Sequence, residues 1–350
     1  MSSRAEVTGK HISRADTDFY KGVGILLIVL HNYFHWVRPN TGENEFGFNV
    51  ERTQRLIDGL SWQPLESANL LLDYFGHYGV QVFVFLSAYG LARAYAERDP
   101  RWITFMLGRI ARIYPVFLLA IVAHFIFVVT PWSPDAWWFV KAYLLKLSTL
   151  SAFVPDMQFS LVGPWWFFPF IVQFYAAFPL LNALVRRHGT WTLIAIGSTG
   201  VVASAALNPW LTDHGVNLYV TVVGHLPVLC LGIYLARCNG VAVSGVAAAL
   251  AAVVFVAGWW SRPPWLLAPV CVTVALLYVL PRLAGVIGRW RLADRFVRHC
   301  GVVSLPLFAI HGLIRDPFTS AANAQGQWWS TLAGAAAFLA LSLVAAQAMV

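Results

Sequence analysis

The chain has 350 residues, of which 59% are hydrophobic and only 11% are charged, and its formal net charge is +8. A soluble domain carries about 25% charged residues, so this composition excludes an ordinary aqueous protein and predicts an all-α polytopic membrane protein. The Lys and Arg residues lie in short loops between apolar runs, which is typical of membrane topology and argues against a nucleic-acid partner.

The first 18 residues are polar and contain no apolar stretch before a cleavage site. We therefore expect a cytoplasmic N-terminal tail at 1–18 and a single transmembrane domain at 19–350. Apolar runs of roughly 17–25 residues can cross a bilayer. Such runs predict about ten spans, at 19–37, 71–92, 112–130, 164–185, 191–208, 217–236, 241–260, 265–281, 302–318 and 329–349.

An eleventh apolar segment, 136–153, carries Lys141 and Lys146. If this segment does not cross the membrane, the Arg clusters of the later loops fall on the same side as Arg109 and Arg112. If it does cross, the cluster at 282–298 falls on the opposite side. The positive-inside rule therefore favours ten spans with both termini in the cytoplasm, and an interfacial or re-entrant helix near 136–153.

The first span reads FYKGVGILLIVLHNYFHWV, and it places His31 about 15 Å along a helix from Lys21. His31 and His35 are one turn apart and share a face. An ionisable group at membrane depth indicates a functional site. The pair could bond neighbouring helices, or it could act as a general base near neutral pH. Two His without an acid on the same helix match catalytic zinc sites poorly, so no metal is expected.

Other polar residues interrupt the later apolar runs. Gln81 and Ser87 lie in the second span, where they could line a cavity or bond neighbouring helices. Arg109 and Arg112 are three residues apart near the start of the third span, where they could bind phosphates or anchor the helix in the cytoplasm. The remaining polar points are Gln173, Tyr175 and His311, each of which could also be a satisfied interior group.

Taken in order, these segments resemble the bacterial membrane acyltransferase-3 family, a group of ten-span O-acyltransferases of surface and secreted glycans. The Arg-x-x-Arg-x-Tyr-Pro and Trp–Gln-Phe-Tyr–Pro-Leu-Leu patterns are the most specific parts of the resemblance. The matching stretches are KGVGILLIVLHN (21–32), YGVQVFVFLSAYGLA (78–92), RIARIYPVF (109–117), WWFFPFIVQFYAAFPLL (165–181), HLPVLCLGIYLAR (225–237) and SLPLFAIH (304–311).

The resemblance implies transfer of an acyl group, usually acetyl, from cytoplasmic acyl-CoA to a sugar hydroxyl. It implies a catalytic role for His31 and an acyl-CoA role for Arg109 and Arg112. The family usually has a basic residue eleven positions before this His, where this chain has Tyr20. Lys21 could reach around the helix, Arg14 could substitute from the tail, or His35 could share the role.

The resulting hypothesis is a membrane O-acetyltransferase of the bacterial inner membrane, which modifies a lipid-linked or exported saccharide such as an exopolysaccharide. Acetyl-CoA is the expected co-substrate, and the expected partners are acyl-CoA, the saccharide acceptor and membrane lipids. The predicted catalytic residues are His31 and His35. The predicted acyl-CoA residues are Lys21, Arg109, Arg112 and Arg14. The predicted cavity residues are Gln81, Ser87, Trp165, Trp166, Gln173, Tyr175 and His311.

Two alternatives remain open at this point. A transporter or exporter could use the same polar points as a permeation path, although no repeat between the two halves of the chain supports it. A structural subunit of a glycan-assembly complex would tolerate the loss of every polar residue named above.

Overall fold

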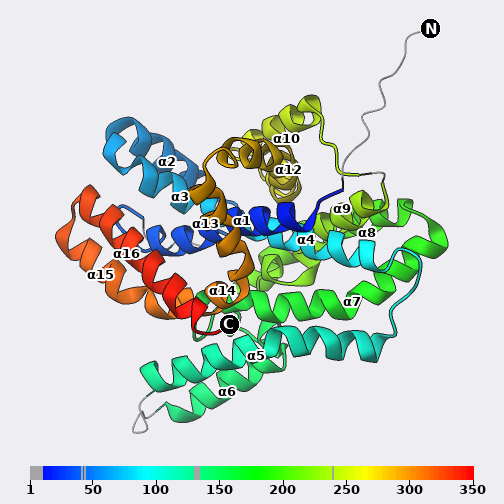
Figure 1. Cartoon of the computed structure of the whole chain (residues 1–350), viewed down its shortest axis with the longest axis horizontal. Helices are drawn as coiled ribbons and strands as arrows, with labels where there is room; N and C mark the ends of the chain where they lie inside the picture. Colours follow the sequence, from blue (N-terminus) through cyan, green and yellow to red (C-terminus); the bar gives the residue numbers. More distant parts are fainter. Residues whose placement is uncertain (1–10, 41, 43–44, 130–134, 239) are drawn as a thin grey trace.

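The computed structural model describes residues 11–40, 42, 45–129, 135–238 and 240–350, and helices are the regular elements of these ranges (Figure 1). The α-helices are α1 (Arg14–Phe34), α2 (Val50–Trp62), α3 (Ser67–Gly76), α4 (Gly79–Ala94), α5 (Trp102–Val128), α6 (Ala136–Leu147), α7 (Phe167–His188), α8 (Trp191–Asp213), α9 (Val222–Arg237), α10 (Gly245–Ala257), α11 (Arg262–Trp265), α12 (Ala268–Ile287), α13 (Arg291–Val302), α14 (Ser304–Ile314), α15 (Asp316–Gln325) and α16 (Trp328–Gln347). The short 3-10 helices are η1 (Pro64–Glu66), η2 (Leu150–Ala152), η3 (Gly163–Trp166) and η4 (Leu218–Val220).

Several of these helices are long and apolar enough to cross a membrane, which confirms the prediction of an all-α polytopic membrane protein. Within the described ranges, the six that meet this criterion are Pro64–Ala94, Trp102–Val128, Gly163–His188, Trp191–Asp213, Ala268–Ile287 and Trp328–Gln347. Helices α9 and α10 are apolar but shorter, and α13 with α14 would form a seventh span if the bent pair counts as one. The number of ten spans stays a prediction.

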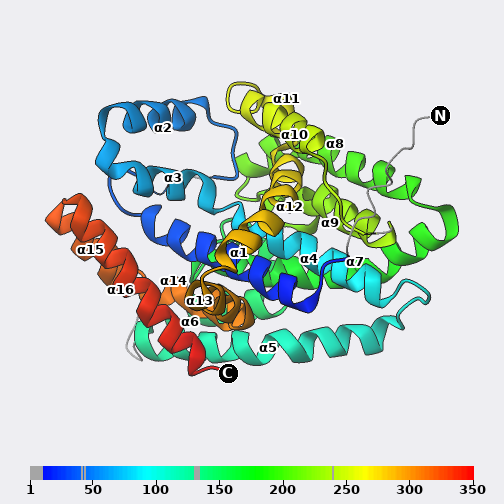
Figure 2. The ribbon, with the colours of Figure 1, turned by 45° about the horizontal axis from the view of Figure 1, so that its top comes forward.

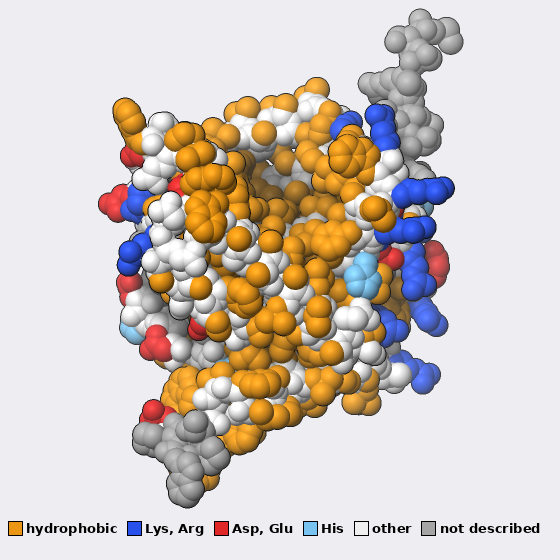
Figure 3. Space-filling model, turned by 60° about the vertical axis from the view of Figure 1, so that its left-hand side comes forward, with side chains coloured by type: hydrophobic (Ala, Val, Ile, Leu, Met, Phe, Trp, Pro, Cys, Tyr) orange, Lys and Arg blue, Asp and Glu red, His pale blue; other side chains and the backbone are white. Residues whose placement is uncertain are grey.

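The surface agrees with this assignment. In Figure 3, hydrophobic side chains cover the middle of the molecular face, whereas charged side chains lie along its two edges. Lys and Arg gather along one of these edges, and acidic and basic side chains mix along the other. An apolar band between two polar edges is the arrangement that a bilayer requires of a polytopic protein.

Helix α1 lies at the centre of the molecule in both ribbon views (Figures 1 and 2). It begins after Ser13, whose side chain accepts a hydrogen bond from the backbone of Asp16, while the Asp16 side chain accepts from the Ser13 backbone. This capping box satisfies backbone donors at the helix start. Helix α1 packs closely on α13 because two glycines face each other: a Cβ at Gly22 would collide with the Val297 carbonyl, and one at Gly301 with the Asp18 carbonyl.

Replacing Gly301 by alanine should therefore destabilise the protein by about 1–3 kcal/mol, since the backbone of α1 cannot move aside for the added methyl group. The matched control is Gly285→Ala on α12, where a Cβ would meet nothing within 4 Å. Alanine there should be neutral or slightly stabilising, because it favours a helix over glycine. Thermal unfolding of the detergent-solubilised proteins, followed by tryptophan fluorescence, measures both changes, and equal midpoints for the two variants would contradict the packing argument.

One end of the bundle carries a concentrated set of basic residues, and we call it the basic end. Here Arg93 at the end of α4 contacts His11, just before α1. Asn182, near the end of α7, donates hydrogen bonds to the Tyr95 and Arg98 carbonyls and accepts one from Arg237 at the end of α9. The basic end therefore combines the start of α1 with the ends of α4, α7 and α9, and it lies on the right in Figure 1.

Helix α6 and the chain after it account for the predicted interfacial or re-entrant segment at 136–153. The helix has 12 residues, about 18 Å, which is too short to cross a bilayer. It lies against α5: Tyr114 donates a hydrogen bond to the Leu147 carbonyl, and His124 bonds the Tyr143 hydroxyl at 2.7 Å. Helix α5 begins at the basic end and α7 ends there (Figure 1). The segment between them therefore stays at the opposite end and does not cross the membrane.

Two segments differ from what the sequence predicts. The predicted span at 302–318 begins at the 83° bend between α13 and α14, and it is interrupted at Arg315, where α14 has ended and α15 follows. The acidic loop after the first span contains α2, whose N-cap is Asn49. Helix α2 lies beside α3 at the end of the molecule opposite the basic end (Figures 1 and 2), and it contributes to the site described next.

Candidate functional site

His31 lies in the last turn of α1 and His35 is the C-cap residue directly after it, and the two are only 3% and 8% exposed. Helix α3 can approach them because Gly76 has no side chain: a Cβ there would lie 2.7 Å from the Cβ of His31. The close approach brings Asp73 to both rings. His31 Nδ1 donates to the Asp73 carbonyl at 2.8 Å, and His35 Nδ1 donates to the Asp73 carboxylate at 2.7 Å.

These two hydrogen bonds fix the chemistry of the imidazoles. A backbone carbonyl and a carboxylate can only accept, so the Nδ1 atom of each ring must carry the proton. In the neutral form, the Nε2 atom of each ring is then the basic nitrogen. Both Nε2 atoms lie on the side away from Asp73, and they approach Glu45.

Glu45 comes from the loop between α1 and α2. Its carboxylate oxygens lie 3.6 Å from His31 Nε2 and 3.8 Å from His35 Nε2. The loop is anchored on both sides of Glu45, because the Gly42 amide donates to the His35 carbonyl at 2.9 Å and the Phe46 ring packs on Trp166. Burial would raise the pKa of the Glu45 carboxyl, but a hydrogen bond from His31 and the positive charge that His31, His35 and His77 carry when protonated lower it below its ordinary value.

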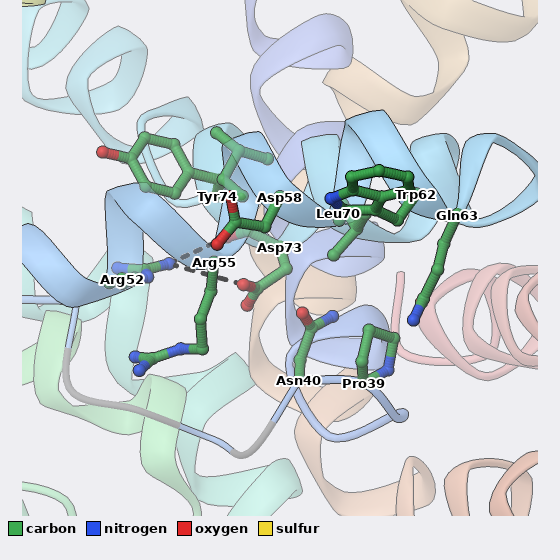
Figure 4. Close-up of a pocket in the computed structure, with 12 residues that line it drawn as sticks. Pro39, Asn40, Arg52, Arg55, Asp58, Trp62, Gln63, Leu70, Asp73 and Tyr74 are labelled. Atoms are coloured by element: carbon green, nitrogen blue, oxygen red, sulfur yellow. Dashed lines mark hydrogen bonds and ion pairs between the residues drawn. The ribbon is translucent and has the colours of Figure 1, made fainter.

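Arg52 supports this arrangement from α2. Its Nη2 donates to the Asp73 carbonyl at 3.1 Å and lies 3.7 Å from the Asp73 carboxylate. Figure 4 shows these contacts in a crevice of about 270 Å³ between α2 and α3. Asp73 therefore separates this crevice from the histidine pair, and it is held from both sides. Two oriented imidazoles with a shared acidic partner can accept protons or bind a cation at their Nε2 atoms.

A cavity of about 490 Å³ opens beside the Nε2 atoms. Ligand pockets are usually concave and mostly apolar, with a few polar groups that converge on the ligand. The polar groups here come from six different parts of the chain. The lining includes His31, Asn32, His35, Glu45, His77, Gln81, Trp166, Tyr219, His225 and Arg315.

Four residues on this wall carry polar groups without a hydrogen-bond partner in the described structure, which leaves these groups available to a ligand. They are the Gln81 side-chain carbonyl, the Tyr219 hydroxyl, His77 Nδ1 and both ring nitrogens of His225. His225 is 3% exposed and stacks on Trp166, with ring centroids 5.8 Å apart and an angle of 4° between the rings. A buried polar group without a partner costs free energy, so this wall is arranged for an occupant that supplies the missing partners.

Of the predicted cavity residues, Gln81 and Trp166 line this cavity, whereas the other five are absent from its lining. Trp165 donates to the Ala309 carbonyl at 2.8 Å, and the Gln173 side chain caps α9 by accepting from the Val222 amide at 3.1 Å. His311 is fully buried and bonds the Leu307 carbonyl of its own helix. The remaining two are Ser87, which is half-buried on α4, and Tyr175, which lies near Arg109.

The predicted acyl-CoA residues are also absent from the lining of this cavity. Arg109 lies over the rings of Phe105 and Tyr175, at 5.1 and 5.7 Å from their centroids. Arg112 is exposed, and Arg14 is exposed at the first position of α1. Lys21 is half-buried, two turns further along α1. The structure thus places the histidine pair toward one end of the bundle and these cations toward the basic end.

The sequence reasoning missed Glu45, Asp73 and His225. Asp73 is an acid within the second predicted span, a position that itself signals function. His225 opens one of the stretches that carry the family resemblance. Glu45 is one of several acids in a polar loop, and nothing in the local pattern distinguishes it from the others, such as Glu43 and Glu51.

The chain was compared with protein-family models, curated proteins and solved structures. A family model described as an acyltransferase domain matches residues 14–350. No curated protein and no solved structure matches the chain. The family match begins at the first residue of α1 and includes every residue of the cavity described above.

Proposed function

The chain belongs to the acyltransferase-3 family, and from this premise we propose that it transfers an acetyl group from acetyl-CoA to a hydroxyl of a lipid-linked or exported saccharide. The observation that carries the proposal is the pair of oriented imidazoles at the 490 Å³ cavity. Their Nδ1 protons are bound to Asp73, so the basic Nε2 atoms are the ones presented to a substrate. Asn32, Gln81 and Tyr219 offer the hydrogen-bonding groups that a saccharide needs.

In the proposed reaction, His31 Nε2 takes the proton of the acceptor hydroxyl as its oxygen attacks the thioester carbonyl carbon. The carbon–sulfur bond breaks, and the CoA thiolate leaves and recovers the proton from the His31 imidazolium. His35 lies with its ring centroid 4.9 Å from that of His31 and shares the site. General-base assistance of this kind contributes on the order of 10²–10⁴-fold to a rate.

We place the donor at the basic end and in the cytoplasm, following the positive-inside rule. In a bacterial cell, this orientation corresponds to the inner membrane. Arg109 and Arg112 supply guanidinium groups suited to the phosphates of CoA, and Lys21 and Arg14 of α1 are the other two cations proposed for this role. His31 lies ten positions after Lys21, about 15 Å along the helix, and the pantetheine arm of CoA would have to cover this distance. The acceptor would enter from the opposite end, where the cavity lies.

The decisive experiment uses the purified chain in lipid nanodiscs with radiolabelled acetyl-CoA and a panel of saccharide acceptors. The expected result is release of CoA that requires an acceptor, together with alkali-labile label in the saccharide. A parallel assay with long-chain acyl-CoA defines the acyl specificity. A chain that neither binds acetyl-CoA nor releases CoA with any acceptor, but moves a saccharide across liposomes, would contradict the proposal and favour a transporter.

A further inference from the structure

We propose that His31, His35 and Glu45 form a binding site for one divalent transition-metal ion of the zinc type. The three side chains each offer one ligand atom, and these atoms all lie within 4.8 Å of one another. Zinc bonds to histidine nitrogen and carboxylate oxygen are about 2.0–2.1 Å long, so tetrahedral ligand atoms lie about 3.3 Å apart. His31 Nε2 lies 3.6 Å from one Glu45 carboxylate oxygen and His35 Nε2 lies 3.8 Å from the other, and both distances already approach that spacing.

The electrostatics of the three groups call for a cation between them. Each Nδ1 atom donates to Asp73, so neutral His31 and His35 both direct the lone pair of Nε2 toward the Glu45 carboxylate. Lone pairs that converge in a buried place repel one another unless a positive charge lies among them. One metal ion can bind all three groups at once, whereas one proton can be shared between only two of them.

Asp73 provides the second reason to expect a metal. Metal-binding histidines almost always donate their other ring N–H to a carboxylate or a backbone carbonyl. His35 donates to the carboxylate of Asp73, and His31 donates to its carbonyl. Arg52 in turn holds both of these acceptors. The outer partners that orient the ligands of a zinc site are therefore already in place.

The ligand set indicates the class of ion. Two imidazoles and one carboxylate favour Zn²⁺, Co²⁺ or Ni²⁺ over Mg²⁺ and Ca²⁺, which prefer oxygen ligands. Three protein ligands leave a fourth position open, and the 490 Å³ cavity adjoins these three residues. From the sequence, no metal was expected because the helix that carries the histidine pair offers no acid beside it. In the structure, Glu45 supplies that acid from the loop between α1 and α2.

Occupation of this site has a consequence that, unlike the site itself, rests on the proposed function. The ion would take the lone pair of His31 Nε2, which the proposed transfer needs to accept a proton. The metal-bound form should therefore be inactive, and the site would make acyl transfer sensitive to free zinc.

Binding is tested directly on the full-length protein in nanodiscs after metal removal. Titration with Co²⁺ should give visible absorption bands that saturate at one equivalent, and Zn²⁺ should displace them. Replacing Glu45 by Gln should remove the saturable signal, and Asp73→Ala should weaken binding about 10–100-fold, as expected for a residue that orients the ligands. Thermal unfolding without metal verifies that each variant is folded.

The matched control is His225→Ala, which removes another buried histidine from the same cavity wall. The wild-type Co²⁺ affinity should persist in this variant. No stoichiometric Co²⁺ binding to the wild-type protein, or an equal affinity in Glu45→Gln, would overturn the proposed site.

The acetyl-transfer assay separates this inference from the proposed function. Transfer should fall in proportion to Zn²⁺ occupancy and return when a chelator is added. Transfer without any metal binding would overturn the site and leave the proposed function standing. Metal binding without transfer under any condition would overturn the proposed function and leave the metal site standing. A rise in transfer on adding Zn²⁺ would overturn the inhibitory consequence.

Discussion

Replacing His31 by alanine should lower the rate of acetyl transfer by about 10²–10⁴-fold, because the substitution removes the base that accepts the hydroxyl proton. The protein should still accumulate in the membrane, since the ring lines a cavity and its removal enlarges that cavity without displacing a neighbour. The measurement is acceptor-dependent CoA release by the purified variant, at saturating concentrations of both substrates.

A second variant distinguishes the loss of a base from a loss of structure. His31→Gln keeps a side-chain donor for the Asp73 carbonyl but has no group that can accept a proton near neutral pH. It should be as inactive as His31→Ala while unfolding at the wild-type temperature. The control is His188→Ala, an exposed histidine at the end of α7, which should retain full activity. Near-normal transfer in both His31 variants would remove this residue from the mechanism.

Replacing Arg109 and Arg112 together by alanine should raise the KM for acetyl-CoA. A hydrogen bond to a charged group is worth about 1.5–3 kcal/mol, so the loss of even one such bond corresponds to roughly 10–100-fold weaker binding. The kcat should change much less, because neither side chain lies at the cavity where the acceptor hydroxyl would react. Initial rates over a range of acetyl-CoA concentrations measure the two constants separately.

The control for this pair is Arg187→Ala, which removes an exposed cation at the end of α7. If general attraction of the anionic donor explained the effect, Arg187→Ala would raise the KM as much as a single Arg109 or Arg112 substitution. Arg109→Lys should lose part of the affinity, because lysine keeps the charge but not the paired donors of the guanidinium group. An unchanged KM in the double variant would place the CoA phosphates elsewhere.

Helix α6 illustrates what charge counting along the sequence can achieve. The Arg clusters of the later loops lie on the cytoplasmic side only if the segment near 136–153 does not cross the membrane. The structure agrees, since α6 is short and lies along α5. The same method gave no indication that the span predicted at 302–318 holds only the 11-residue α14 and the start of α15, or that α14 follows an 83° bend after α13. Hydropathy reports how apolar a run is, and the direction of the chain within it depends on packing.

The lining of the cavity is a feature that the sequence predicts only in part, since five of the seven predicted residues are absent from it. Trp165, Gln173 and His311 were expected to line it because they are polar or aromatic points in apolar helices. Each of them instead bonds the backbone of a helix, either a neighbouring one or its own. The rotation of a helix about its axis decides whether such a residue points at a cavity or at a neighbour. That rotation is set by the sum of its contacts, which a single sequence does not reveal.

The sequence by itself determined that this protein is a membrane-embedded helical bundle, and it placed His31 and His35 on one face of the first helix. Both conclusions follow from local periodicity and from the cost of placing polar groups in hydrocarbon. Only the tertiary structure decided that Asp73 and Glu45 meet those two rings from opposite sides. Glu45 reaches them through a loop, and a loop takes its path from contacts with distant residues such as Trp166, for which the local pattern holds no signal.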